Sequence, residues 1–246
     1  MPRLTDILTV AQGETATIVG SGGKTALLWL LARHYQHNRV LVTTTRKIGL
    51  PEATRFGVFR DSDTLLEQAV RPGITLAGEA APDKDFVKIG ALAPDVLEEA
   101  RRYFDHIFIE GDGSKTLPLK GWADYEPVVP AFSDCTVGIL PLWPLGLAVD
   151  ETIIHRLPLF CAISGASPGE SLTVGHLASA ITHPAGLFKD SHGRRVILLN
   201  QVEDQQAEAT AAQLVDALGR DFLQGIALVV CGSVLRDEGK VLWSLA

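Results

Sequence analysis

The fold is decided by the stretch Thr17-Ile18-Val19-Gly20-Ser21-Gly22-Gly23-Lys24-Thr25, which the apolar run 26–31 follows directly. An apolar strand, a glycine-rich turn, Lys-Thr and a helix in this order predict a phosphate-binding loop. Glycines let backbone N–H groups converge on phosphate oxygens, and the helix N-terminus adds partial positive charge. The usual spacing places a glycine where Ile18 stands, so the loop is of the shorter Gly-x-x-Gly-Lys-Thr kind found in amino-acid ligases of cell-wall and folate synthesis. The alternative is an ordinary turn before a helix.

A loop of this type assigns a role to each of its side chains. Lys24 is expected to reach the outer phosphates, and the Thr25 hydroxyl to ligate Mg²⁺. The sequence therefore predicts a magnesium-dependent site for ATP or GTP. Its nucleotide contacts in the loop are Gly20, Ser21, Gly22, Gly23, Lys24 and Thr25.

Composition narrows the class of protein. The 246 residues are 46% hydrophobic, which is enough for a substantial core, and we expect one domain over residues 1–246. A net charge of -7 argues against a nucleic-acid partner or an anionic membrane surface. The three cysteines form no Cys-x-x-Cys pair, and the longest uncharged run, 135–149, is too short to span a bilayer. These features predict a soluble cytoplasmic protein.

Apolar and amphipathic segments alternate along most of the chain. Besides residues 17–19, strands are expected at 39–42, 74–77, 86–89, 106–110, 136–140, 195–199 and 226–230, with 74–77 and 86–89 as a possible hairpin. Helices are expected at 26–31, 94–103, 151–163, 173–182 and 204–218. This order predicts an α/β fold of the P-loop NTPase-like, doubly wound kind, with a mostly parallel sheet and helices on both faces. Residues 111–130 lack periodicity and are interpreted as a long active-site loop.

Ligands of such sheets bind beyond the carboxyl ends of the strands, so the residues there are the candidates for chemistry. Glu110 and Asp112 follow a buried strand and are predicted to serve the metal, with a slight preference for Asp112. Lys115 and Lys120 are candidates for stabilising developing phosphate charge, with Lys115 as the catalytic choice. The alternatives are turn or capping carboxylates and solvated surface lysines.

Two further strand ends are candidates for nucleotide contacts. Thr44 ends the second strand and has a hydroxyl suited to a phosphate or metal shell, although threonine is common at strand ends. Residues 200–203 have the outline of the Asn-Lys-x-Asp element that reads guanine, with Asn200 and Glu203 as the contacts. Gln201 and Glu203 replace the Lys and Asp of that element, so the base stays open, and a plain turn is the alternative.

Taken together, these segments resemble the accessory proteins of selenium-dependent molybdenum hydroxylases, the YqeC family of selenium cofactor biosynthesis. The resemblance rests on residues 19–25, 42–48, 110–115, 117–120, 126–130, 154–156, 182–189 and 198–200. It implies an NTP-binding protein that assists maturation of selenium-containing molybdenum hydroxylases, with such an enzyme or its cofactor as partner. By position, it implies phosphate and metal contacts in the loop and a second catalytic segment of Glu110, Asp112, Ser114 and Lys115.

Three functional hypotheses remain open at this point. The first is slow hydrolysis of ATP or GTP that drives cofactor maturation. The second is a small-molecule phosphotransferase or acyl-phosphate-forming ligase, and the third is a nucleotide-gated binding module without turnover. Trp122 and Trp143 lie in segments without periodicity, so they are expected either on a partner surface or covering the sheet edge.

Overall fold

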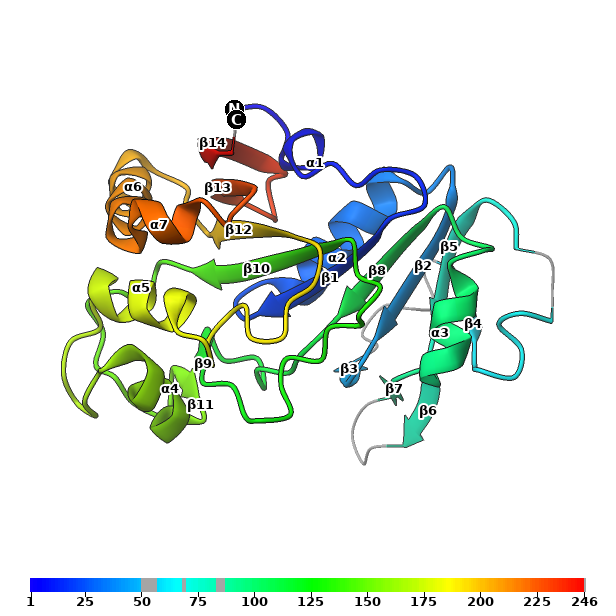
Figure 1. The fold of residues 1–246 in the computed structure, drawn as a ribbon, viewed down its shortest axis with the longest axis horizontal. Helices are drawn as coiled ribbons and strands as arrows, with labels where there is room; N and C mark the ends of the chain where they lie inside the picture. Colours follow the sequence, from blue (N-terminus) through cyan, green and yellow to red (C-terminus); the bar gives the residue numbers. More distant parts are fainter. Residues whose placement is uncertain (50–56, 68–69, 83–86, 246) are drawn as a thin grey trace.

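A large, mostly parallel sheet forms the centre of the computed structural model, which describes residues 1–49, 57–67, 70–82 and 87–245 (Figure 1). Within these residues the sheet has the strand order β14-β13-β12-β10-β1-β8-β2-β5-β4. Its strands are β1 (Thr15–Gly20), β2 (Arg39–Thr44), β4 (Gly57–Arg60), β5 (Gly73–Ala77), β8 (His106–Glu110), β10 (Cys135–Pro141), β12 (Arg194–Asn200), β13 (Leu228–Ser233) and β14 (Glu238–Ser244).

Helices lie on both faces of this sheet (Figure 1). They are α1 (Leu4–Ile7), α2 (Lys24–His34), α3 (Pro94–Ala100), α4 (Leu157–Ser164), α5 (Val174–Thr182), α6 (Gln205–Leu218) and α7 (Arg220–Leu223). Alternate residues of each strand enter different cores: Ile18 of β1 packs with α2, whereas Val19 packs with α4, α5 and α6. Burial on both faces explains why the strands are continuous apolar runs. The predicted α/β architecture is confirmed.

The direction of chain travel reverses between β1 and β10. From β1 the chain crosses through α2 to β2 on one side of the sheet, and from β10 it passes through α4 and α5 to β12 on the other. All neighbouring strands of the sheet are parallel except β13 and β14, which are antiparallel. A reversal of this kind leaves a crevice at the carboxyl ends of the two strands. The glycine-rich loop follows β1 at this point.

Two small sheets lie outside the main one and correct three sequence predictions. Strand β9 (Leu119–Lys120) pairs with β11 (Ile154–His155), so residues 111–130 contain a strand and 151–163 is not wholly helical. The hairpin of 74–77 with 86–89 is wrong, because β5 pairs with β2 in the main sheet. Instead β7 (Val87–Gly90) pairs with β6 (Glu79–Pro82) and with β3 (Lys47–Gly49).

The two ends of the chain meet at one edge of the sheet (Figure 1). The backbone N–H of Leu4 donates to the Asp237 carbonyl oxygen at 3.1 Å, and that of Gly239 donates to the Pro2 carbonyl oxygen at 3.1 Å. The Asp237 carboxylate also accepts from the Arg3 side chain and from Thr5. Helix α1 is thus held against the turn that leads into β14, an antiparallel edge strand that the sequence prediction missed. Among the described residues, no helix is long and apolar enough to cross a membrane.

Candidate functional site

The glycine-rich loop after β1 has a backbone that only glycine adopts readily. Gly20, Gly22 and Gly23 have φ values of 100°, 72° and 135°. A Cβ would also lie 2.2 Å from the Ile139 carbonyl oxygen at Gly20, and 2.4 Å from Asn200 Nδ2 at Gly23. The loop therefore combines positive φ angles with close approach to β10 and β12. The backbone N–H groups of Gly22 and Gly23 make no hydrogen bond to the described part of the chain.

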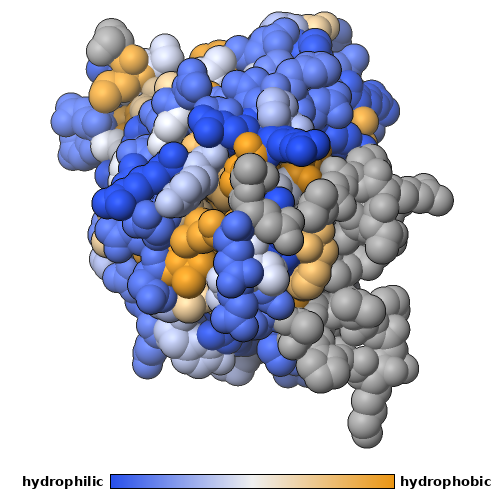
Figure 2. Space-filling view, turned by 90° about the vertical axis from the view of Figure 1, so that its right-hand side faces the viewer, coloured by the Kyte–Doolittle hydropathy of each residue, from blue (hydrophilic) through white to orange (hydrophobic). Residues whose placement is uncertain are grey.

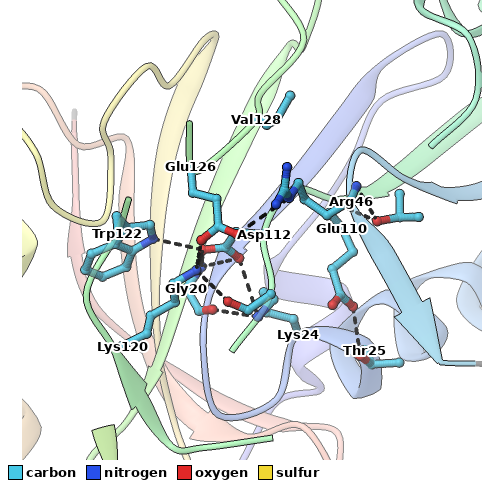
Figure 3. Close-up of polar contacts among 12 residues, drawn as sticks. Gly20, Lys24, Thr25, Arg46, Glu110, Asp112, Lys120, Trp122, Glu126 and Val128 are labelled. Atoms are coloured by element: carbon cyan, nitrogen blue, oxygen red, sulfur yellow. Dashed lines mark hydrogen bonds and ion pairs between the residues drawn. The ribbon is translucent and has the colours of Figure 1, made fainter. Parts of the chain in front are cut away.

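Helix α2 begins at Lys24, directly after these glycines. The Lys24 side chain is buried and turns back across the loop, where Nζ donates to the Gly20 carbonyl oxygen at 2.6 Å and lies 3.4 Å from Asp112 Oδ1. Thr25 Oγ1 donates to Glu110 Oε2 at 2.8 Å. The structure thus brings the predicted loop lysine, the loop threonine and both predicted metal carboxylates together (Figure 3).

Asp112 is fully surrounded by donors. Its carboxylate accepts from the Gly20 N–H at 3.1 Å, from Lys120 Nζ at 2.9 Å and from Trp122 Nε1 at 2.8 Å. The side chain is 0% exposed, so these contacts replace water completely. With its oxygens committed in this way, Asp112 fixes the loop relative to residues 113–122 (Figure 3).

Lys120 connects Asp112 to a second carboxylate. Its Nζ, also buried, donates to Glu126 Oε2 at 2.8 Å and to the Gly113 carbonyl oxygen at 2.6 Å. Arg156 donates to Glu126 as well, and Arg46 Nε lies 3.5 Å from Glu126 Oε1. Although burial alone would raise it, hydrogen bonds from Arg156 and Lys120 lower the pKa of Glu126 to about 2. Sequence reasoning missed Glu126 and Arg46, whose pairing spans some 80 residues of chain, and gave Arg156 no role.

Of the three buried carboxylates of the site, Glu110 has fewer hydrogen-bond and ion-pair partners than Asp112 or Glu126. Burial raises its pKa, and the nearby Lys24 and the Thr25 hydrogen bond oppose that rise only in part. A buried carboxylate and an adjacent hydroxyl are hard oxygen ligands of the kind that Mg²⁺ takes together with water and phosphate. Thr25 and Glu110 therefore fit a magnesium ion, whereas the four donors around Asp112 occupy its lone pairs.

The predicted nucleotide contacts further from the loop are engaged within the protein. Thr44 Oγ1 donates to the Glu110 carbonyl oxygen at 2.9 Å, and Asn200 Nδ2 donates to the Gly22 carbonyl oxygen at 2.8 Å. The Asn200 side-chain oxygen accepts from Val234 N–H at 3.0 Å, so Asn200 ties the loop to the end of β13. Glu203 accepts from Ser233 and pairs with Arg236 at 2.6 Å. A base contact at Asn200 and Glu203 stays a prediction.

Lys115 and the two tryptophans are placed differently from one another. The Lys115 side chain is exposed and makes no hydrogen bond or ion pair with the described residues, while Lys120 occupies the position beside Asp112. Trp122 is only 8% exposed and donates to Asp112, so it belongs to the core and the prediction of a partner surface there is wrong. Trp143 is 51% exposed.

Figure 2 shows the side of the molecule that lies at the right of Figure 1. The visible described residues there are mostly hydrophilic, and the hydrophobic ones gather in small separate groups. Large hydrophobic side chains that are exposed include Tyr125, Trp143 and Leu159. Of these, Tyr125 lies next to Glu126 and contacts Arg46 and Arg156.

Comparisons with known proteins identify the family of this chain. The family model described as YqeC protein matches residues 16–158, more than half of the chain, and this range spans the loop, Glu110, Asp112, Lys120, Glu126 and Arg156. The chain is also similar to a protein named YqeC from Escherichia coli (strain K12), with 30% identity over 217 residues that cover 85% of this chain and 84% of the relative. On both grounds, the chain belongs to the YqeC family.

Proposed function

We propose that this protein binds a nucleoside triphosphate, ATP or GTP, with Mg²⁺ at the loop of residues 20–25 and hydrolyses it slowly. The observation that carries the proposal is the joint geometry of the loop, in which two unbonded N–H groups precede a helix that begins with Lys24. Backbone donors and a lysine at a helix N-terminus suit phosphate oxygens. From the sequence, residues 20–25 are the segment predicted to combine backbone donors, a lysine and a helix start.

Some residues around the loop would bind the ligand, and others position the loop. Thr25 and Glu110 would hold Mg²⁺, which supplies charge neutralisation for the phosphate oxygens when bound. Lys24 would exchange its present acceptor, the Gly20 carbonyl oxygen, for phosphate oxygens. Asp112 and Lys120 position the Gly20 peptide and the adjoining segment, and Lys115 in its exposed position is free to approach a bound ligand.

The biological role follows from the family. The resemblance to accessory proteins of selenium-dependent molybdenum hydroxylases supports a role in selenium cofactor biosynthesis and in maturation of those enzymes. Such a role makes the hydroxylase or its cofactor the partner of this protein. A nucleotide cycle suits a maturation step, because binding and release of phosphates change the contacts of Lys24 and Glu110 at the edge of the sheet.

A phosphotransferase or acyl-phosphate-forming ligase is the second candidate, and one observation favours it. The cationic side chains Arg46 and Arg156 lie partly exposed beyond Glu126, where an anionic acceptor would find donors. Transfer of the terminal phosphate to a product other than water distinguishes this candidate from hydrolysis. A non-hydrolysing binding module would show neither product.

The test is titration calorimetry with Mg-ATP and Mg-GTP on the folded protein and two variants. Lys24→Met removes the charge but keeps most of the side-chain volume, and we expect at least tenfold weaker binding from the loss of charge-assisted hydrogen bonds. Lys240→Met is the control, because Lys240 lies on the edge strand β14 and its one ion pair among the described residues is with Glu208. Absence of nucleotide binding to the wild-type protein at millimolar concentration, or equal binding by Lys24→Met, refutes the proposal.

The maturation role needs a separate measurement in cells. Deletion of the protein should lower the activity of a selenium-dependent molybdenum hydroxylase in cells grown with selenium, and wild-type protein should restore it. Restoration by Lys24→Met to the same level would show that the nucleotide site is not used in that role.

A further inference from the structure

A second group of cations lies beyond the loop, around the side chain of Glu126. Arg46 follows β2 and Arg156 follows β11, and both guanidinium groups bind the same carboxylate. Both also lie against one aromatic ring: the Arg46 and Arg156 guanidinium carbons are 4.8 Å and 5.6 Å from the centre of the Tyr125 ring. Two like charges are thus held side by side at the surface by contacts with Glu126 and with the Tyr125 ring.

Some N–H donors of Arg46 and Arg156 have no acceptor among the described residues. Each guanidinium carries five N–H donors in a planar fork. Among the described residues, only Glu126 and the Tyr125 hydroxyl accept from them, and the Arg46 contact with Glu126 is long at 3.5 Å. The side chains are 39% and 22% exposed, so the remaining donors are within reach of a ligand.

The local charge is positive although the chain as a whole carries -7. The ion-paired group that contains Glu126 has four cations and two carboxylates: Lys24, Lys120, Arg46, Arg156, Asp112 and Glu126. Positive charges are thus in excess, and Arg46 and Arg156 are the partly exposed cations of the group. Besides burial, the positive charges of Arg156, Lys115 and Lys120 lower the pKa of His155, which reports the same field.

Local backbone conformation and hydrogen bonds hold the segments that carry Arg46, Tyr125 and Arg156. Arg156 has a φ of 59°, a left-handed conformation that is uncommon for a non-glycine residue and that often marks functional positions. The Arg46 N–H donates to Thr44 Oγ1 at 3.0 Å. Lys189 Nζ donates to the carbonyl oxygen of Asp124 and lies 3.4 Å from that of Glu126, on either side of the exposed Tyr125.

We propose that Arg46 and Arg156, with Tyr125 beside them, form a second anion site that binds a phosphate group of a small molecule other than the nucleotide. The planar forks of two arginines suit a tetrahedral oxyanion, and the Tyr125 ring offers a contact for the organic part. The site does not require the loop to bind a nucleotide. It is joined to the loop through Glu126, Lys120 and Asp112, so an anion that draws the arginines from Glu126 also changes the surroundings of Lys120.

The test uses inorganic phosphate as the probe and ³¹P NMR line broadening to obtain Kd at low ionic strength. Because phosphate would also bind the loop, the measurements are made on the Lys24→Met protein. Adding Arg46→Gln or Arg156→Gln should weaken phosphate binding about tenfold each, the effect of losing one charge-assisted hydrogen bond. Adding Arg102→Gln is the matched control, because Arg102 is 76% exposed and its one ion pair among the described residues is with Glu99.

The outcomes distinguish nucleotide binding at residues 20–25 from anion binding at Arg46 and Arg156. Kd values of both arginine variants within twofold of the Lys24→Met protein, or an equal loss with Arg102→Gln, overturn the second anion site and leave nucleotide binding untouched. Nucleotide binding that survives Lys24→Met refutes the loop proposal and leaves the second site intact. If thermal melting shows that Lys24→Met is unfolded, the single variants are compared in the wild-type background, where saturating phosphate should fall from two per chain to one.

Discussion

Replacing Lys120 with methionine should lower the free energy of unfolding by about 3 to 5 kcal/mol at pH 7, which is the usual result of removing one partner from a buried ion pair. The Lys120 side chain is 0% exposed and its ammonium group serves two carboxylates, Asp112 at 2.9 Å and Glu126 at 2.8 Å. Methionine fills most of the same volume, so little of the loss would come from a cavity. What remains is two buried carboxylates with fewer donors.

Urea unfolding at 25 °C followed by circular dichroism measures this loss. Lys240→Met is the control, because Lys240 is 53% exposed and its pair with Glu208 should contribute about 0.2 to 1 kcal/mol. A second substitution, Glu126→Gln, should restore part of the stability of Lys120→Met by removing one of the unpaired charges. If Lys120→Met lies within 1 kcal/mol of the control, or if Glu126→Gln makes it worse, the account of this network is wrong.

Three further substitutions or conditions test the site. Gly23→Ala should destabilise the protein by about 2 kcal/mol in thermal or urea unfolding, because its Cβ would lie 2.4 Å from Asn200 Nδ2, while Gly146→Ala, with positive φ but open space, should lose less. Since the pKa of Glu126 is lowered from 4.5 to about 2, its contribution is present above pH 4.5 and is lost as the pH falls to 2; at about 1.4 kcal/mol per pH unit this is about 3 kcal/mol, and Glu126→Gln should flatten the acid limb of the stability profile. Glu110→Gln should be at least as stable as wild type at pH 7, because burial raises the pKa of Glu110 and the amide removes a buried charge, yet Mg²⁺ should no longer strengthen nucleotide binding in calorimetry.

Local patterns were enough to predict most of the sheet and the loop. Strand β8 begins and ends where the apolar run 106–110 does, and α5 and α6 agree with their periodic segments to within a residue. The edge strand β14 was missed because its exposed positions interrupt the apolar alternation, so its pairing with β13 decides its structure. Propensity is a weak guide where tertiary contacts decide.

The site was predictable only where its residues are close in sequence. The loop, Glu110 and Asp112 follow directly from strand ends, and the structure places them together. The position of Lys120 beside Asp112 depends on the short strand β9, whose pairing partner β11 lies about 35 residues further on, so the sequence alone could not place it there. Likewise Trp122 is a residue type common in interaction surfaces. Its burial and its hydrogen bond to Asp112 show that it is part of the core.

The contact between α1 and the turn before β14 also constrains how the chain folds during synthesis. Helix α1 is synthesised well before its hydrogen-bond partner Asp237, which lies 232 residues after Thr5 in the chain. Even β1, at the centre of the sheet, has to wait for β8 and β10, about 90 and 120 residues later. Loop-closure entropy makes such distant pairing slow. The apolar residues of β1 therefore stay without their native neighbours until these later segments have been made.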